Sequence, residues 1–444
     1  MKVNLVLIFI FALIPIALLP AVTAADGLDK TEKKIVEYVN ATTEDAIQVL
    51  EDQVNINSGT LHIEGVRKAG EAIRPYFEKI GFEVSWEDMP EEMGRAGNLF
   101  AQRRADPGQG RSLLLIGHLD TVFEPDHPFQ TFEREKDGDK DVGRGPGVAD
   151  MKGGNIAILF ALKALHEVGA LENTNITVAL MGDEERAGRP LDIARAGLIN
   201  AARRSDVALG FETASRDDKG EYATIARRSS TGWSLRVEGR QGHSSGIFSD
   251  HAGSGAIFEA ARILNAFHEE LKGERYLTFN AGIILGGTDV QLDSATSRGT
   301  AAGKSNVIPQ SAIVTGDIRT LTDEQLNDVR KRMREIVERH LPRTNAEIRF
   351  RDGYPSMPPE EGNLKLLELL NEINRDLGAP IMEAFDPGRR GAADISFVAP
   401  HVDSALAALG VFGRGAHSPD EEIDLASLPV VIQRTALLIY RLTR

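Results

Sequence analysis

The spacing of apolar residues predicts alternating helices and strands in the first half of the chain. Apolar side chains recur with a helical period at residues 28–54, 63–80, 153–168 and 191–203. Short apolar or alternating runs typical of strands lie at residues 82–86, 112–116, 175–181 and 206–211. Apolar strands that alternate with helices indicate a mainly parallel sheet with helices on both faces. We therefore expect an α/β fold for this half of the chain.

The pattern changes near residue 222, where alternating strands and strongly amphipathic helices begin. The expected order is a strand at 234–238, a helix at 256–271, strands at 278–285 and 311–319, a helix at 326–340 and a strand at 346–351. That order is typical of a ferredoxin-like α+β module. A proline-rich stretch then precedes helices at 364–377 and 428–442 and a strand at 405–409. We predict a smaller domain at 229–352, inserted between two parts of a larger domain at 26–228 and 353–444.

The first 25 residues have the pattern of a secretory signal peptide. Lys2 is followed by an uncharged apolar stretch at 5–19 and then by small residues up to Ala25. The alternative is an uncleaved membrane anchor, but the stretch is shorter than the roughly 20 residues that a span requires, and Pro15 interrupts it. We expect cleavage near Ala24 or Ala25 and a secreted or periplasmic mature protein that is no longer attached to a membrane.

Composition excludes several classes of protein. The 444 residues are enough for two or three domains. The 51 basic and 66 acidic residues give a net charge of −15 without any basic block, which argues against a nucleic-acid binder. Cysteine is absent, so disulfides, thiol nucleophiles and thiolate metal sites are excluded. Any metal must be held by His, Asp and Glu.

Two stretches of the larger domain carry an acid or a histidine directly after an apolar strand or a glycine-rich turn. His118 and Asp120 lie two residues apart after a buried strand, so both side chains point the same way. That spacing lets a carboxylate accept the second ring N–H of a metal-bound imidazole, although a strand-end histidine and a turn aspartate are the simpler interpretation. Asp150 follows a glycine-rich turn and precedes a helix, which also suits a helix cap.

Three more positions add acids and a second histidine. Asp183, Glu184 and Glu185 end an apolar strand, where adjacent like charges need a cation, either a metal or Arg186. Glu184 and Glu185 point in different directions, so one could bind a metal while the other moves protons. Glu212 ends another strand and His417 lies in a loop near glycines. Because strand ends of an open α/β sheet bind ligands, these residues together predict a two-metal site for a cation such as zinc.

With these motifs the chain resembles a known family over nearly its whole mature length. The motifs are GHLDTV at 117–122, GPGVADMKGG at 145–154, DEE at 183–185 and FET at 211–213. They resemble the co-catalytic zinc exopeptidases that include glutamate carboxypeptidase, peptidase T, aminoacylase and succinyl-diaminopimelate desuccinylase, and they are most similar to the glutamate carboxypeptidase branch. The resemblance implies a zinc-exopeptidase-like fold in which the inserted domain acts as a lid and dimerisation domain.

The resemblance also implies a role for each residue of the site. It implies two zinc ions per subunit, one bound by His118 and Glu212, the other by Glu185 and His417, and both bridged by Asp150. It implies that Asp120 orients His118 and that Glu184 is the general base.

Further residues are implied to handle the substrate. His243, within GRQGHSS at 239–245, would polarise the scissile carbonyl, typically across a homodimer interface. Asn306 and Arg319 would hold a substrate carboxylate. Arg389 and Arg390 occupy the place of a glycine-rich substrate loop, where relatives more commonly have Gly or Thr.

The leading hypothesis is therefore a zinc carboxypeptidase that removes a C-terminal residue from a small peptide or acyl amino acid. An N-acyl amino acid deacylase or a dipeptidase with the same metals is the nearest alternative, and a non-catalytic binding protein on this fold is a more distant one. Glu184, beside a full set of ligands, favours an enzyme. A serine hydrolase is disfavoured because no G-x-S-x-G elbow occurs in the sequence.

Overall fold

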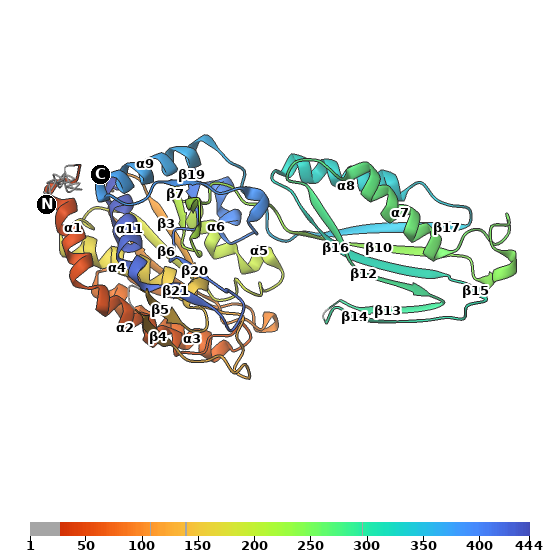
Figure 1. Ribbon diagram of the computed structural model, residues 1–444, viewed down its shortest axis with the longest axis horizontal. Coiled ribbons are helices and arrows are strands. Elements are labelled where there is room, and N and C mark those ends of the chain that lie inside the picture. The colour runs from red at the N-terminus through yellow and green to blue at the C-terminus, as the bar shows by residue number, and fades with distance from the viewer. Residues whose placement is uncertain (1–26, 107, 138–139, 295) are drawn as a thin grey trace, which may run out of the picture.

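The chain folds into two lobes that are joined by a pair of neighbouring segments (Figure 1). The computed structural model describes residues 27–106, 108–137, 140–294 and 296–444. The predicted signal peptide, at residues 1–25, lies outside the described residues. The larger lobe contains both the first helix and the last helix of the described chain, and the smaller lobe is formed by the middle of the sequence (Figure 1).

The larger lobe is built on a six-stranded sheet, in the order β1-β2-β6-β3-β7-β19. The strands are β1 (Glu83–Glu87), β2 (Asn98–Arg103), β3 (Leu113–His118), β6 (Ile176–Met181), β7 (Val207–Gly210) and β19 (Ser404–Leu406). β3 runs parallel to β6 and β7, and β19 runs parallel to β7. β1 and β2 form an antiparallel edge. The expectation of a mainly parallel α/β sheet is confirmed, with this antiparallel edge added.

Helices cover both faces of that sheet, as the apolar strands require. The helices are α1 (Lys30–Ala41), α2 (Thr43–Val54), α3 (Ile63–Lys79), α4 (Gly153–Glu167), α5 (Leu191–Ala194), α6 (Ala196–Ala202), α9 (Glu361–Leu377), α10 (Ile395–Val398) and α11 (Leu428–Leu442). Leu113 and Leu115 of β3 join the core cluster under α4 and α11, whereas Leu114 and Ile116 join the cluster under α6 and α10. The helix predicted at 191–203 is divided into α5 and α6 at Arg195, whose side chain is fully buried.

Among the described residues, one helical segment is long and apolar enough to cross a membrane. This segment, Leu425–Leu442, includes α11, and 67% of it is buried inside the structure. α11 packs against α4 and α1 and contributes Leu437, Leu438 and Ile439 to the main core. Its apolar character therefore matches its position as a core helix.

The smaller lobe has a four-stranded antiparallel sheet with two helices on one face. Its elements are β10 (Thr231–Gly239), α7 (Ala256–Leu271), β12 (Thr278–Gly287), β16 (Ser311–Arg319), α8 (Asp323–Val337) and β17 (Thr344–Arg351), and the strand order is β12-β16-β10-β17. Trp233, Leu235 and Val237 alternate along β10 and pack under the helices. This is the ferredoxin-like strand order that the sequence predicts. We call these elements the inserted lobe.

Besides β2 of the six-stranded sheet, several short strands were not predicted from the sequence. In the inserted lobe they are β11 (Gly242–His243), β13 (Asp289–Asp293), β14 (Arg298–Ala302) and β15 (Val307–Ile308). In the larger lobe they are β4 (Glu133–Asp137), β5 (Lys140–Arg144), β8 (Ser215–Asp217), β9 (Gly220–Ala223), β18 (Met382–Ala384), β20 (Gly413–Arg414) and β21 (Glu422–Asp424). The pairing of β5 with β21 is important for the site, because it places the loop at 415–421 beside the turn that contains Asp150.

Candidate metal centre

The predicted ligands lie at one edge of the six-stranded sheet. His118 ends β3, the Asp183–Glu185 segment follows β6, and Glu212 follows β7. Because these three strands are parallel, their carboxyl ends meet at the same edge, which is where open α/β sheets bind ligands. Asp150 comes from the turn before α4, and His417 comes from the loop between β20 and β21.

A tight turn presents Asp150 to this edge. Gly147 has a φ of 71°, and a Cβ at this position would lie 2.4 Å from the side chain of Thr121. Only glycine meets both constraints. The backbone N–H groups of Gly147, Ala149 and Asp150 all donate to the carboxylate of Glu421, at 2.9–3.0 Å. Glu421, which is fully buried, therefore holds the turn in place.

The two oxygens of Asp150 face two different imidazoles. Oδ1 lies 3.2 Å from Nε2 of His118, and Oδ2 lies 3.2 Å from Nε2 of His417. Glu212 Oε1 is 3.8 Å from the same nitrogen of His118, and Glu185 Oε2 is 2.9 Å from that of His417. The structure thus brings the five predicted ligands into two groups that share one carboxylate. With Glu184 we call them the His–carboxylate cluster.

Glu184 lies beside the first group, within 4.8 Å of ligand atoms of His118 and Glu212. Its backbone is fixed by Asp120, whose two carboxylate oxygens accept the N–H groups of Glu184 and Glu185 at 3.0 and 3.1 Å. Nδ1 of His118 also faces residue 120, at 3.0 Å from its carbonyl oxygen and 3.3 Å from Oδ1. Asp120 therefore contacts both His118 and the backbone of Glu184, which is more than the HxD spacing suggested.

Burial and mutual repulsion favour the protonated forms of Glu184 and Glu212, whereas neighbouring carboxylates favour a protonated His417. Burial, together with the charge of Asp150, raises the pKa of Glu212 to about 7. Burial and the charge of Glu212 raise the pKa of Glu184 well above its usual range. Hydrogen bonds to Asp150 and Glu185 raise the pKa of His417 to about 10. A divalent cation that binds here displaces such protons, so metal binding and proton release are linked.

The residues present fit a pair of divalent cations. Glu185 Oε1 is buried and has no hydrogen-bond partner within the described ranges. The carboxylates gathered here are those of Asp120, Asp150, Asp183, Glu184, Glu185, Glu212 and Asp394. The guanidinium groups among them are those of Arg195, Arg227 and Arg390. The acids outnumber the arginines, and donors that are carboxylate oxygen and imidazole nitrogen suit zinc.

The cation beside Asp183 is Arg195 rather than Arg186. Arg195 donates to Asp183 Oδ1 at 2.5 Å and to Asp394 Oδ1 at 2.7 Å, and it is fully buried. Arg186 is exposed. Arg186 is therefore not the cation beside Asp183, whereas a metal beside Glu184 and Glu185 stays a prediction. Adjacency along the chain pointed to Arg186, whereas Arg195 reaches Asp183 from the junction of α5 and α6.

The predicted substrate residues lie apart from this cluster, with one exception. His243 and Asn306 are exposed, and they sit next to β15, at the end of the inserted lobe away from the larger lobe (Figure 1). Arg319 pairs with Asp317 of its own strand at 3.1 Å. Arg389 is exposed and faces Asp217 at 3.6 Å. Arg390 is the exception, because it donates to the carbonyl of Thr213, next to Glu212, at 2.7 Å.

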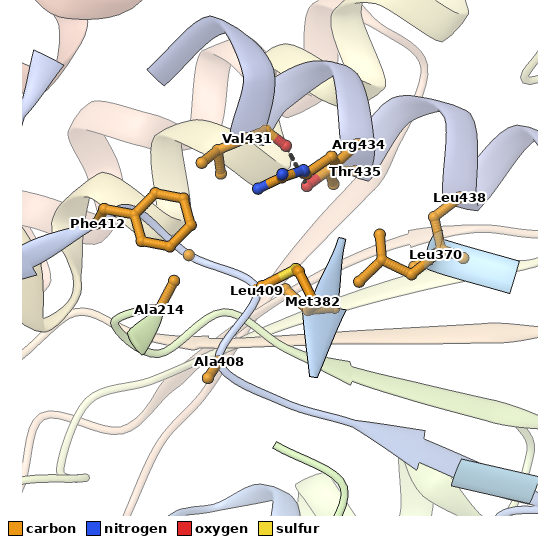
Figure 2. Close-up of a pocket in the computed structure, with 11 residues that line it drawn as sticks. Ala214, Leu370, Met382, Ala408, Leu409, Phe412, Val431, Arg434, Thr435 and Leu438 are labelled. Atoms are coloured by element: carbon orange, nitrogen blue, oxygen red, sulfur yellow. Dashed lines mark hydrogen bonds between the residues drawn. The ribbon is translucent and has the colours of Figure 1, made fainter. Parts of the chain in front are cut away.

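A small cavity elsewhere in the larger lobe does not share this chemistry. Figure 2 shows it beneath α11, with Leu370, Met382 and Phe412 pointing into it. Its charged wall residue, Arg434, is already paired with Glu221 at 2.7 Å and Asn374 at 2.6 Å. This cavity is an apolar packing gap and offers a polar ligand no free partner among the residues that line it.

The family assignment follows from comparison with known proteins. Residues 114–441 match the family model described as "Peptidase family M20/M25/M40". The chain belongs to this family. The resemblance noted from the motifs is thereby confirmed, as is the assignment to metallopeptidases, which are hydrolases. Members of the M20 family are metal-dependent, typically with zinc, and the His–carboxylate cluster lies within the matched region.

Relatives of this M20 peptidase are named for different activities. It is 27% identical over 403 residues to carboxypeptidase G2 of Pseudomonas sp. strain RS-16, and the match covers 88% of each chain. It is 26% identical over 348 residues to a succinyl-diaminopimelate desuccinylase of Psychrobacter sp., covering 76% of this chain and 80% of the relative. Its fold is similar to that of aminopeptidase PepT from Bacillus cereus, with a TM-score of 0.70 and 16% identity over 90% of this chain and 99% of that one.

Proposed function

We propose that this M20 peptidase is a carboxypeptidase that hydrolyses the peptide or amide bond next to a free C-terminal amino acid. The observation that carries the proposal is the position of Asp150, whose two oxygens face His118 and His417 at 3.2 Å each, with Glu184 alongside. A carboxylate shared between two imidazoles is suited to bridging two cations, and a further free carboxylate beside them is suited to moving protons.

The chemistry divides between the cations and the side chains of this chain. When bound, two zinc ions held by the cluster supply Lewis acidity and make the attacking water more acidic. Glu184 removes a proton from that water and delivers it to the amine nitrogen that leaves. Asp120 holds the backbone of Glu184 while this happens, because both of its oxygens are occupied by the N–H groups of residues 184 and 185.

Recognition of the C-terminal carboxylate falls to the inserted lobe and to the loop at 387–391. Arg319, at the linker end of β16, supplies a guanidinium group, and Asn306, beside His243 at the opposite end of the lobe, supplies an amide from a second subunit; these two groups suit a free carboxylate. Arg390 adds a positive charge next to Glu212, and Arg389 lies one residue away with an exposed side chain. These charges favour a substrate that ends in a carboxylate over one that ends in a free amine.

His243 completes the site from a second subunit of a homodimer. It is exposed and far along the inserted lobe from its own cluster (Figure 1). The same lobe exposes Phe248, Ile257, Phe258 and Ile284, whose exposed fractions are 67%, 44%, 51% and 56%. Ile284 lies on β12, an edge strand, so apolar side chains and unpaired backbone groups occur together. Such a surface suits pairing with a second copy of the chain, whose His243 then donates to the oxyanion.

An N-acyl amino acid deacylase or a dipeptidase is the second candidate. The desuccinylase relative has nearly the same sequence identity to this chain as carboxypeptidase G2, 26% against 27%, over a shorter stretch. One experiment separates these activities. The purified protein is analysed for metal and then assayed against dipeptides, tripeptides and N-acyl amino acids with free or amidated C-termini. We expect two zinc ions per chain and hydrolysis only where the C-terminal carboxylate is free. Equal hydrolysis of the amidated substrates would overturn the carboxypeptidase assignment.

We also propose that the mature protein is exported. The support is the sequence of the first 25 residues, with Lys2, an apolar stretch and small residues before Asp26. N-terminal sequencing of the protein purified from cells is expected to begin near Ala25 or Asp26. A chain that keeps the apolar stretch would contradict cleavage.

A further inference from the structure

The two segments that connect the lobes are hydrogen-bonded to each other. Arg227 and Met357 exchange backbone hydrogen bonds of 2.8 and 2.9 Å, and Ser230 donates to the carbonyl of Tyr354 at 2.8 Å. Tyr354 lies three residues after the end of β17, so it belongs to the return segment from the inserted lobe. Any change in the orientation of the lobe passes through these residues.

The hydroxyl of Tyr354 reaches from this linker into the larger lobe. It donates to the backbone carbonyl of Glu184 at 3.0 Å and accepts from Nη2 of Arg195 at 3.2 Å. The ring packs against Phe397, with centroids 4.9 Å apart. Burial and the charge of Asp394 raise the pKa of Tyr354 well above its usual range, so the hydroxyl keeps its proton and remains a donor.

Glu184 is therefore held from two sides by two different parts of the molecule. Its N–H is bound by Asp120, which belongs to the larger lobe, and its carbonyl is bound by Tyr354, which belongs to the linker. The adjacent carbonyl, that of Asp183, accepts from Arg195 at 3.2 Å, and Arg195 is itself in contact with Tyr354. The orientation of this short backbone segment sets where the Glu184 carboxylate points.

We propose that Tyr354 is a positioning residue that couples the linker of the inserted lobe to the general base, through the hydrogen bond from its hydroxyl to the carbonyl of Glu184. This inference rests on the proposed role of Glu184 as the base. A productive orientation of the lobe keeps the hydrogen bond from the Tyr354 hydroxyl to the Glu184 carbonyl, and a displaced linker breaks this hydrogen bond. Because a misplacement of about 1 Å can cost on the order of 100-fold in rate, one hydrogen bond is enough to make turnover depend on the linker.

The test compares Tyr354→Phe with Tyr354→Leu in the full mature protein. The phenylalanine variant removes one oxygen atom and keeps the ring against Phe397, whereas the leucine variant also removes the ring. Tyr440→Phe is the matched control. The ring of Tyr440 packs under Arg444 and its hydroxyl donates to Asp29, both in the larger lobe. The measurements are kcat and KM on the best substrate of the dipeptide and N-acyl amino acid panel, zinc content and the melting temperature.

We expect Tyr354→Phe to lower kcat by about tenfold with KM, zinc content and melting temperature unchanged. Tyr354→Leu should lose activity to a similar extent, and Tyr440→Phe should behave as the wild type. A fully active Tyr354→Phe enzyme would overturn the proposal, as would a variant that loses zinc or stability in parallel with activity. Failure of the base assignment itself is recognised separately, since Glu184→Gln would then retain turnover whatever Tyr354→Phe does.

Discussion

The His–carboxylate cluster and the residues of the inserted lobe proposed to bind substrate differ in how much of their geometry is already in place. In the cluster, every ligand faces another at 2.9–3.8 Å, from the buried His118 to the exposed His417. In the inserted lobe, His243 and Asn306 are exposed, and Arg319 is paired with Asp317. The difference teaches that the proposed chemistry is preorganised within one lobe, whereas the proposed substrate recognition would depend on how lobes or subunits come together.

The largest effect is expected from Asp150→Ala, which breaks the cluster at the residue that both halves share. Loss of both oxygens removes the bridge between His118 and His417, so zinc content should fall toward zero and activity below detection. Metal analysis and the hydrolysis assay measure this. Asp88→Ala, at an exposed ion pair with Arg67, is the control. Two zinc ions retained by Asp150→Ala would show that Asp150 is not the bridge.

Glu184→Gln separates proton transfer from metal binding within the same cluster. The amide cannot accept the proton, so kcat should fall by about 10²–10⁴-fold, which is the usual contribution of a general base. Zinc content should stay at the wild-type value, because the two ligand groups are intact. Substantial residual turnover, or loss of the metal, would remove Glu184 from this role.

His243→Ala tests whether the inserted lobe acts on a neighbouring subunit. The rate should fall by about 10²–10³-fold, typical for loss of an oxyanion donor, with zinc content unchanged. Mixing this variant with Glu184→Gln should restore about a quarter of the wild-type activity, since half of randomly paired dimers then have one complete site.

The control for this mixture is His268→Ala, an exposed histidine on α7 that should have full activity alone. If the mixture stays inactive although sedimentation shows mixed dimers, His243 does not act in trans. A fully active enzyme that sediments as a monomer would contradict the shared site altogether.

Arg319→Ala should have the smallest effect and should act on binding. Removing a charged partner of the substrate carboxylate is expected to raise KM by about tenfold with little change in kcat, because such hydrogen bonds contribute about 1.5–3 kcal/mol. Arg349→Ala, an exposed arginine of the same lobe paired with Glu347, is the control. An unchanged KM would place carboxylate recognition elsewhere, with Arg390 as the next residue to replace.

The ligand-bearing segments could be found in the sequence because each one is local. His118 and Glu212 directly follow short apolar runs, and Asp150 follows a glycine-rich turn. The fold class and the family resemblance, both inferred from such segments, are confirmed by the family match and by the PepT-like fold. Some strands were missed because they are exposed: β14 has no buried residue, so no alternation of apolar and polar positions marks it. β2 was missed although its first four residues are buried.

The residues that support the cluster could not be found in this way, because their partners are distant in sequence. Arg195 and Asp394 are 199 residues apart, and Tyr354 is 170 residues from Glu184. Glu421 lies four residues after His417, yet nothing in the neighbouring sequence indicates that it binds a turn 274 residues away. Such contacts are specified by the packing of the whole lobe and by no spacing along the chain.

The position of Glu421 also sets the order in which the site can be assembled. One loop, at 415–421, contains both the ligand His417 and the carboxylate that holds the Asp150 turn. A chain still emerging from the ribosome has His118, Asp150, Glu185 and Glu212 long before it has that loop. Both ligand groups are therefore complete only once the segment at 415–421 has folded back onto the turn that contains Asp150.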